Sequence, residues 1–197
     1  MRRIIKDRNS KILSENLEYI PNNSNNNSKI SRELYKEQKG FCAYTEKHLG
    51  RTDAKDIEHF NPTLKGTNED SYENWFLVKH QWNKEKSNKW AKQQPILHPT
   101  DPTFEKRIIY DDGDYRANEE QDLEAMNFIK LLNLDDLVLA EERKKYLSRK
   151  ASEIETFETN AEDFFSLLIK EDITGINFLR AIDEEFEIDI WELLPKL

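Results

Sequence analysis

Four polar residues between positions 58 and 83 have the chemical types needed to hydrolyse a phosphodiester bond. Glu58 offers a hard carboxylate oxygen suited to Mg²⁺ or Mn²⁺, and the adjacent His59 can act as a general base near neutral pH. Asn83 offers an amide oxygen as a second metal ligand, and Asn74 could orient the imidazole of His59. Together they would supply a cation that neutralises phosphate charge, a base that activates water, and a group that orients the base.

Lysines gather around the last of these residues. Lys86 follows Asn83 by three positions, so the two would share one face of a helix, and Lys86 could hold a phosphate beside the metal. Further positive charge comes from Lys79, Lys84 and Lys89. Each signal taken alone has an ordinary alternative, since Glu-His pairs and lysine-rich helices are common on solvated surfaces. The functional interpretation therefore depends on the combination.

Short elements are expected to position these side chains. Residues 56–60 are predicted to form a strand, residues 75–78 a second, apolar strand, and residues 82–92 a helix, which gives a compact ββα unit. Neighbouring residues of a regular strand point to opposite faces, so Glu58 and His59 can serve one site only if the strand twists or ends there. The proline three residues after His59 makes such an ending plausible.

In order and spacing, Glu58-His59, Asn74, Asn83 and Lys86 resemble the HNH nuclease family. The family pattern is an acidic residue or His followed by His, a middle Asn, and a final His or Asn with Lys three residues later. The resemblance implies a ββα-metal fold in which Glu58 and Asn83 bind one Mg²⁺ or Mn²⁺ ion. It also implies that His59 is the general base of an endonuclease, with Asn74 as its orienting partner and DNA as the expected substrate.

The chain departs from this family at one feature. Many HNH proteins fold around a zinc ion held by two Cys-x-x-Cys pairs, and the corresponding positions here are Cys42 with Thr45 and Lys79 with Trp82. One thiol cannot complete a closed tetrahedral site, so we expect no structural zinc. The alternative, a zinc held by that thiol and three histidines, fits no recognised spacing; those histidines are His48, His80 and His98.

Aromatic side chains are expected to replace the contribution of the missing zinc by apolar burial. They are Phe41, Tyr44, Trp75 and Trp82. Loss of the cysteine pairs also keeps a second function open, that of a catalytically inactive HNH-fold binding module or adaptor. Such a module would bind nucleic acid or a partner without cleavage and would gain no stability from divalent metal.

A narrower resemblance covers roughly residues 41–147. Leu97-His98-Pro99, the Asp112-Gly113 turn, and residues 125–134 followed by Arg143 are similar to the HNH proteins of Septu-type anti-phage systems, including retron-associated ones, often called PtuB. That family works with an ABC-type ATPase, PtuA. The resemblance therefore implies the nuclease subunit of an anti-phage complex.

The net charge of −9 is unevenly distributed. Residues 1–110 hold 20 Lys and Arg against 15 Asp and Glu, whereas residues 111–197 hold 10 against 24. The basic half carries the candidate site and suits a polyphosphate partner. The acidic half would repel nucleic acid and could contact a basic partner protein such as the ATPase, or it could be an ordinary solvated helical surface.

The predicted class is mainly α with a small ββα-metal unit and a helical C-terminal half. We divide the chain into an N-terminal segment with a polar loop and a short helix (1–39), the HNH unit (40–95), and a hairpin with a helical region (96–197). Residues 22–28, which contain only Asn and Ser, are predicted to form the loop. Residues 114–174 lack Gly and Pro and carry apolar residues at helical spacing, which predicts long amphipathic helices.

Boundaries within the second half follow from turn and cap residues. The Asp112-Gly113 pair predicts a hairpin turn, and Asn133 followed by Asp135-Asp136 predicts a break between two helices. A last helix is expected near residues 176–186. A single cysteine and the lack of a ~20-residue apolar run favour a cytoplasmic protein without a membrane span.

Overall fold

The computed structural model describes residues 1–87 and 89–197, with Ser87 described by its backbone only. About half of the chain is helical, and the described residues form two small antiparallel sheets. The helices in chain order are α1 (Lys11–Ser14), α2 (Ser24–Glu37), α3 (His80–Ser87), α4 (Phe104–Arg107), α5 (Leu123–Leu132), α6 (Leu137–Thr156), α7 (Ala161–Asp172), α8 (Leu179–Phe186) and α9 (Ile190–Leu193). The strands are β1 (Lys55–His59), β2 (Trp75–Lys79), β3 (Ile108–Asp111) and β4 (Asp114–Ala117).

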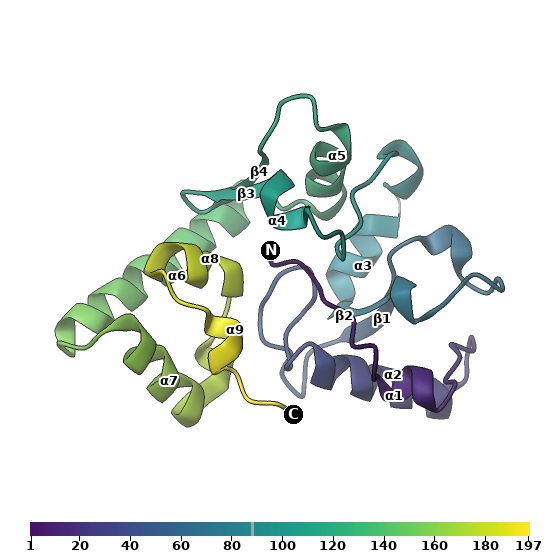
Figure 1. Ribbon diagram of the computed structural model, residues 1–197, viewed down its shortest axis with the longest axis horizontal. Coiled ribbons are helices and arrows are strands. Elements are labelled where there is room, and N and C mark those ends of the chain that lie inside the picture. The colour runs from purple at the N-terminus through teal and green to yellow at the C-terminus, as the bar shows by residue number, and fades with distance from the viewer. Residues whose placement is uncertain (88) are drawn as a thin grey trace.

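The first sheet carries the predicted site residues. β1 pairs with β2 in antiparallel register, which places Asp56 opposite Val78 and Glu58 opposite Phe76. β2 continues directly into α3, and the first amide of α3 bonds back to the carbonyl of Ala54 before β1. Figure 1 shows α2 and α3 on opposite sides of this sheet. The sheet therefore has one face toward each helix.

The helix after β2 is shorter than the predicted range of residues 82–92. α3 begins at His80, because β2 enters it without a loop, and its described part ends at Ser87. Asn88 lies outside the described residues, and Trp90–Lys92 forms a separate 3₁₀ turn. The ring of Trp90 packs edge-on against Phe60, 5.3 Å between centroids, which turns the chain back toward the core after α3.

The polar run at residues 22–28 is not the predicted loop, because α2 begins inside it at Ser24. The side chain of Asn23 caps the helix by accepting a hydrogen bond from the Asn26 amide at 3.1 Å. Asn27 bonds through its side chain to the backbone amide and carbonyl seven residues upstream. Side-chain hydrogen bonds, rather than apolar burial, therefore hold this end of the helix.

Of the four aromatic residues expected to support the unit, Tyr44 and Trp75 pack in the hydrophobic cluster around the first sheet, whereas Phe41 packs in the cluster of the C-terminal helices. Phe41, Tyr44 and Trp75 are buried, and Trp82 is partly buried against both hydrophobic clusters of the protein. Cys42 is also buried, and its Sγ accepts a hydrogen bond from the Lys79 amide at 3.4 Å. The predicted apolar replacement for a zinc knuckle is therefore present as packing.

The second sheet is the predicted hairpin. β3 and β4 are joined by Asp112 and Gly113, which have φ of +43° and +83°, as an Asp-Gly turn requires. Arg143 of α6 is buried and donates to the carbonyls of Gly113, at 2.6 Å, and of Leu134, at 2.7 Å. The hairpin is thus fastened to the long helix behind it.

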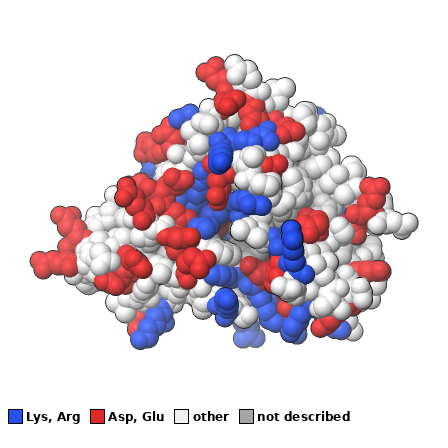
Figure 2. All heavy atoms as spheres, in the orientation of Figure 1, with Lys and Arg blue, Asp and Glu red and all other residues white. Residues whose placement is uncertain are grey.

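Helices α6 to α9 form the C-terminal half and enclose a second hydrophobic cluster. The predicted break is confirmed: Asn133 ends α5 in the left-handed conformation, and Asp136 caps α6. The last helix predicted near residues 176–186 begins at Leu179 and is followed by the short α9. Figure 2 shows many acidic side chains on this side of the molecule and a band of basic side chains toward the middle. No described helix combines the length and apolarity that a membrane crossing requires.

Two glycines allow a test of the hairpin packing. A Cβ on Gly113 would lie 2.5 Å from Cγ of Lys144 and 3.0 Å from the carbonyl oxygen of Ala140, whereas one on Gly66 would meet nothing within 4 Å. Both have positive φ, so Gly66→Ala should lose about 1–2 kcal/mol from backbone strain alone. Gly113→Ala should lose more, measured by urea unfolding. Equal losses would show that the contact with α6 is unimportant.

Candidate active site

The face of β1 that packs on α3 carries two carboxylates. Asp56 and Glu58 are two positions apart on the strand and so share this face. On α3, Asn83 and Lys86 are three positions apart and share the facing side of the helix. Nδ2 of Asn83 donates to Oδ2 of Asp56 at 2.8 Å, and Nζ of Lys86 pairs with Oε1 of Glu58. The spacing on the strand therefore matches the spacing on the helix.

Glu58 and Lys86 form an ion pair inside the protein, each 1% exposed. Lys86 Nζ also donates to the backbone carbonyls of His59, at 2.8 Å, and Phe60, at 2.5 Å, and Tyr44 donates to Glu58 at 3.3 Å. Burial lowers the pKa of Lys86 and raises the pKa of Glu58, and in each case the partner's charge opposes the shift. The expected metal ligand and the expected phosphate-binding lysine are therefore bound to each other.

One oxygen of Glu58 remains unpartnered. Oε2 is buried and has no hydrogen-bond partner among the described residues. A buried carboxylate oxygen without a donor is unfavourable, so this atom is available to a cation or a donor that reaches it.

A second polar cluster lies further from the core. His80 Nδ1 and Asn83 Nδ2 both lie 2.8 Å from Oδ2 of Asp56. The side chains of Asp56 and His80 are 30% and 58% exposed, so this carboxylate is accessible to solvent, unlike Glu58. Our sequence interpretation missed Asp56 and His80 as partners of Asn83. Their spacing could have identified them. Asp56 is two residues before Glu58, so the two share a strand face, and His80 is three residues before Asn83, so the two share a helix face.

His59 points away from this face of β1. Its ring lies edge-on to Tyr19, with 4.5 Å between centroids, and near Trp75. Its Nε2 is 3.1 Å from Oδ2 of Asp70, at an angle outside that of a hydrogen bond. Burial lowers the pKa of His59 to about 4, against the opposing charge of Asp70. The imidazole is therefore neutral at physiological pH, as a general base must be.

Asn74 contacts Asp70 rather than the imidazole in the described structure. Its Nδ2 donates to Oδ1 of Asp70 at 3.2 Å and to the carbonyl of Asn61 at 3.1 Å, and its Oδ1 accepts from the Asn61 amide at 2.7 Å. Trp75 Nε1 also donates to Oδ1 of Asp70, at 2.7 Å. Asn74 thus fixes the loop and the carboxylate next to His59. Asp70 was not predicted, because ten residues separate it from His59 in the sequence and it lies in the polar loop before β2.

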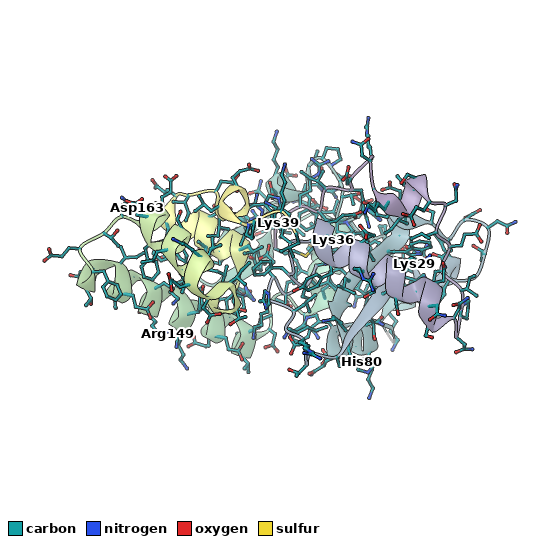
Figure 3. All side chains as sticks on the ribbon, turned by 90° about the horizontal axis from the view of Figure 1, so that it is seen from below. Lys29, Lys36, Lys39, His80, Arg149 and Asp163 are labelled. Carbon is teal, nitrogen blue, oxygen red and sulfur yellow. The ribbon has the colours of Figure 1, made fainter. Side chains whose placement is uncertain are left out.

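The other predicted phosphate-binding lysines lie apart from one another. Lys79 pairs with Asp53 at 3.0 Å, and Lys89 donates to the side chain of Asn133 in the loop after α5. Lys84 is exposed on α3. Figure 3 shows α2, with Lys29 and Lys36, in front of the sheet and His80 at the sheet's edge.

The residues weighed for a zinc site lie in separate surroundings. The ring of His48 packs on Phe41, and that of His98 packs on Phe60, whereas Cys42 accepts from the Lys79 amide. Over residues 1–87 and 89–197, no group of three His, Cys, Asp or Glu side chains is placed to hold a metal ion. The cluster of Asp56, His80 and Asn83 contains two such side chains and an amide.

A known family model matches part of the chain. Residues 42–92 match a family model described as HNH endonuclease. This segment contains β1, β2, α3 and every residue predicted for the site, so the match supports a nuclease domain here. No curated protein and no solved structure matches the chain.

Substitutions of Glu58 and Lys86 should have strongly non-additive effects on the free energy of unfolding. Lys86→Met leaves the carboxylate of Glu58 buried without a cation, and we expect a loss of about 3–5 kcal/mol in the free energy of unfolding. The double variant Glu58→Gln/Lys86→Met should lose much less than the sum of the single losses, because neither charge is then stranded. A double-mutant cycle in urea measures this coupling, and additive losses would contradict it.

The neutral state of His59 can be measured by NMR titration. We expect a midpoint near pH 4 instead of the ordinary value of about 6.5, and Asp70→Asn should lower it further, because the charge of Asp70 favours the imidazolium. The stability gained from a neutral His59 is complete above pH 6.5 and is lost as pH falls from about 6.5 to about 4. His98, whose pKa burial also lowers to about 4, is the internal control and should not respond to Asp70→Asn.

Proposed function

We propose that residues 40–95 form a ββα-metal unit and that the protein is a metal-dependent endonuclease acting on nucleic acid, with DNA as the expected substrate. The observation that carries the proposal is the arrangement at β1. One face of this strand presents Asp56 beside Asn83, and the end of the same strand carries a buried, neutral His59 beside Asp70. The match of residues 42–92 to an HNH endonuclease model supports it.

The residues near Asp56 fit a divalent cation. Oδ2 of Asp56 has Nδ2 of Asn83 and Nδ1 of His80 within hydrogen-bond distance, and a turn of the Asn83 amide would present its oxygen instead, so that a carboxylate and an amide oxygen would suit Mg²⁺ or Mn²⁺. The unpartnered Oε2 of Glu58 lies on the same face of β1. We assign Asp56 and Asn83 as ligands and Glu58 as a further ligand through Oε2. A bound ion would neutralise the charge of the scissile phosphate.

His59 supplies the base in this proposal. Because Asp70 lies next to Nε2, the tautomer with the proton on Nε2 is favoured, which leaves Nδ1 to accept a proton from water. The imidazolium formed would then be stabilised by the carboxylate of Asp70. Asn74 and Trp75 hold that carboxylate in place through its other oxygen. Asn74 and Trp75 donate hydrogen bonds to Asp70 and not to the imidazole, so they act as positioning residues.

We further propose that the protein is the nuclease subunit of a Septu-type anti-phage complex with an ABC-type, PtuA-like ATPase. The similarity of residues 41–147 to the PtuB proteins supports this assignment. The excess of acidic residues in the C-terminal half supports a contact with a basic surface of the partner, and Figure 2 shows much of that acidity on the side of α6 to α8. This surface is opposite in charge to one that would bind nucleic acid.

Cleavage of plasmid DNA and of labelled RNA in Mg²⁺ or Mn²⁺, with and without the ATPase, tests the proposed reaction. His59→Ala should slow cleavage about 100-fold to 10,000-fold, because it removes the base. Asp56→Asn should raise the metal concentration required. Asp111→Asn, on the exposed tip of the β3–β4 hairpin, is the matched control and should cleave normally.

Two results would contradict this proposal, the first in its mechanism and the second in its function. Cleavage that survives His59→Ala would remove His59 from the mechanism. Binding without cleavage, together with a melting temperature unaffected by divalent metal, would identify an inactive binding module instead.

A further inference from the structure

A groove of about 800 Å³ runs along β1 on the side of α2. α2 forms one wall, and β1 with the loops on either side of it forms the other. Four of the lining residues are cations: Arg32 from α2, Arg51 from the loop before β1, Lys55 from β1, and Lys65 from the loop after it. Asp56 is the single acidic residue recorded in the lining. The groove is therefore strongly positive, although the chain as a whole is acidic.

The positive charge of the groove is not neutralised within the protein. In the described part of the chain, no carboxylate forms an ion pair with any of the four cations. Arg32 and Arg51 are exposed, Lys55 donates to the carbonyl of Gly50 at 3.1 Å, and Lys65 lies over the ring of Tyr19. By contrast, Lys79 and Lys86 pair with carboxylates. The groove thus keeps its charge for a ligand from outside.

The wall formed by α2 adds short polar side chains. Ser24, Asn27, Ser28 and Ser31 share the face of the helix that lines the groove. The Asn27 amide is already bonded to the backbone of Ile20, and the Ser28 hydroxyl donates to the Ser24 carbonyl, so the hydroxyls of Ser24 and Ser31 are the groups this wall offers to a ligand. Hydroxyl groups bond to phosphate oxygens and sugars without reading sequence. The Asn and Ser run that looked like a linker in the sequence is therefore one wall of a polar groove.

The groove reaches the proposed active site at two points. Asp56 and Asn83 are part of its lining, and so is Tyr19, whose ring contacts His59. A polyanion lying in the groove would pass both the proposed metal ligands and the proposed base. The rings of Tyr19 and Tyr35 are covered by Lys65 and Lys55, at 5.0 and 5.4 Å, so they do not offer open faces for stacking bases.

From these observations we infer that the groove between α2 and β1 binds the sugar–phosphate backbone of the nucleic acid and leads it, without sequence recognition, to the site at β1. This inference rests on the proposed function for the identity of the polyanion. It assigns substrate binding to Arg32, Arg51, Lys55 and Lys65, none of which lies in α3. The lysines of α3 and its flanks are then not the main phosphate contacts.

The test is equilibrium binding in EDTA, where no cleavage occurs, using a fluorescent duplex and a single strand of unrelated sequences. The charge reversal Arg32→Glu/Arg51→Glu should weaken binding at least tenfold for both. Arg32→Ala should lower the slope of log affinity against log salt by about 1. The matched control is Lys145→Glu/Arg149→Glu, which makes the same charge change on exposed positions of α6, away from the groove (Figure 3). It should bind like the wild type.

The outcomes distinguish failure of the groove assignment from failure of the proposed nuclease activity. If the groove variant loses binding while the wild type never cleaves, the groove assignment stands and the proposed enzyme fails. If the wild type cleaves but the groove variant binds and cleaves normally, or the control loses as much binding, the groove assignment fails. Displacement of the nucleic acid by polyglutamate at equal charge would also overturn it, because the groove would then accept any acidic chain. Both double variants replace exposed residues, and thermal melts confirm that they fold.

Discussion

The buried ammonium group of Lys86 fixes how α3 lies on the first sheet. It bonds to Glu58, to the carbonyl of His59 at the end of β1 and to the carbonyl of Phe60 just after it, so the helix cannot slide along the strand without leaving a charge unpaired in the core. Burying both charges costs desolvation free energy. This cost is offset because the ammonium of Lys86 donates to three oxygens and Glu58 also accepts from Tyr44. One helical turn earlier, Asn83 is then brought to Asp56. The candidate site is a consequence of this register.

The alternation of side chains along β1 divides the chemistry between two faces. Asp56 and Glu58 face α3, where oxygen and nitrogen donors gather, while His59 faces the loop that carries Asp70. A carboxylate beside a histidine usually favours its charged form, but here burial dominates and the imidazole stays neutral. The same strand thus places two carboxylates on one side and a buried imidazole on the other, and of these residues Asp56 lines the groove beside α2.

Charge is arranged on the scale of the whole molecule as well. The basic groove beside β1 and the acidic helices α6 to α8 lie in different parts of the fold, each with its own hydrophobic cluster. The two parts are joined by the N-terminal segment, where Arg2 pairs with Asp183, and by Phe41, which precedes the first sheet in the chain but packs in the C-terminal cluster. The basic groove and the acidic helices are therefore separate surfaces of opposite charge.

The sequence by itself determined the local features: the order of two strands and a helix, the Asp112-Gly113 turn, the cap at Asp136, and which residues could do chemistry. These follow from backbone preferences and periodicity, which act over a few residues. Only the tertiary structure decided that Lys86 neutralises Glu58, that Asp70 rather than Asn74 stands next to His59, and that the polar run before Ile30 is helical. Periodicity tells which face a side chain takes, but its partner and its degree of burial depend on segments distant in the chain. The protonation of His59 depends on such neighbours, so it could not be inferred from the local sequence.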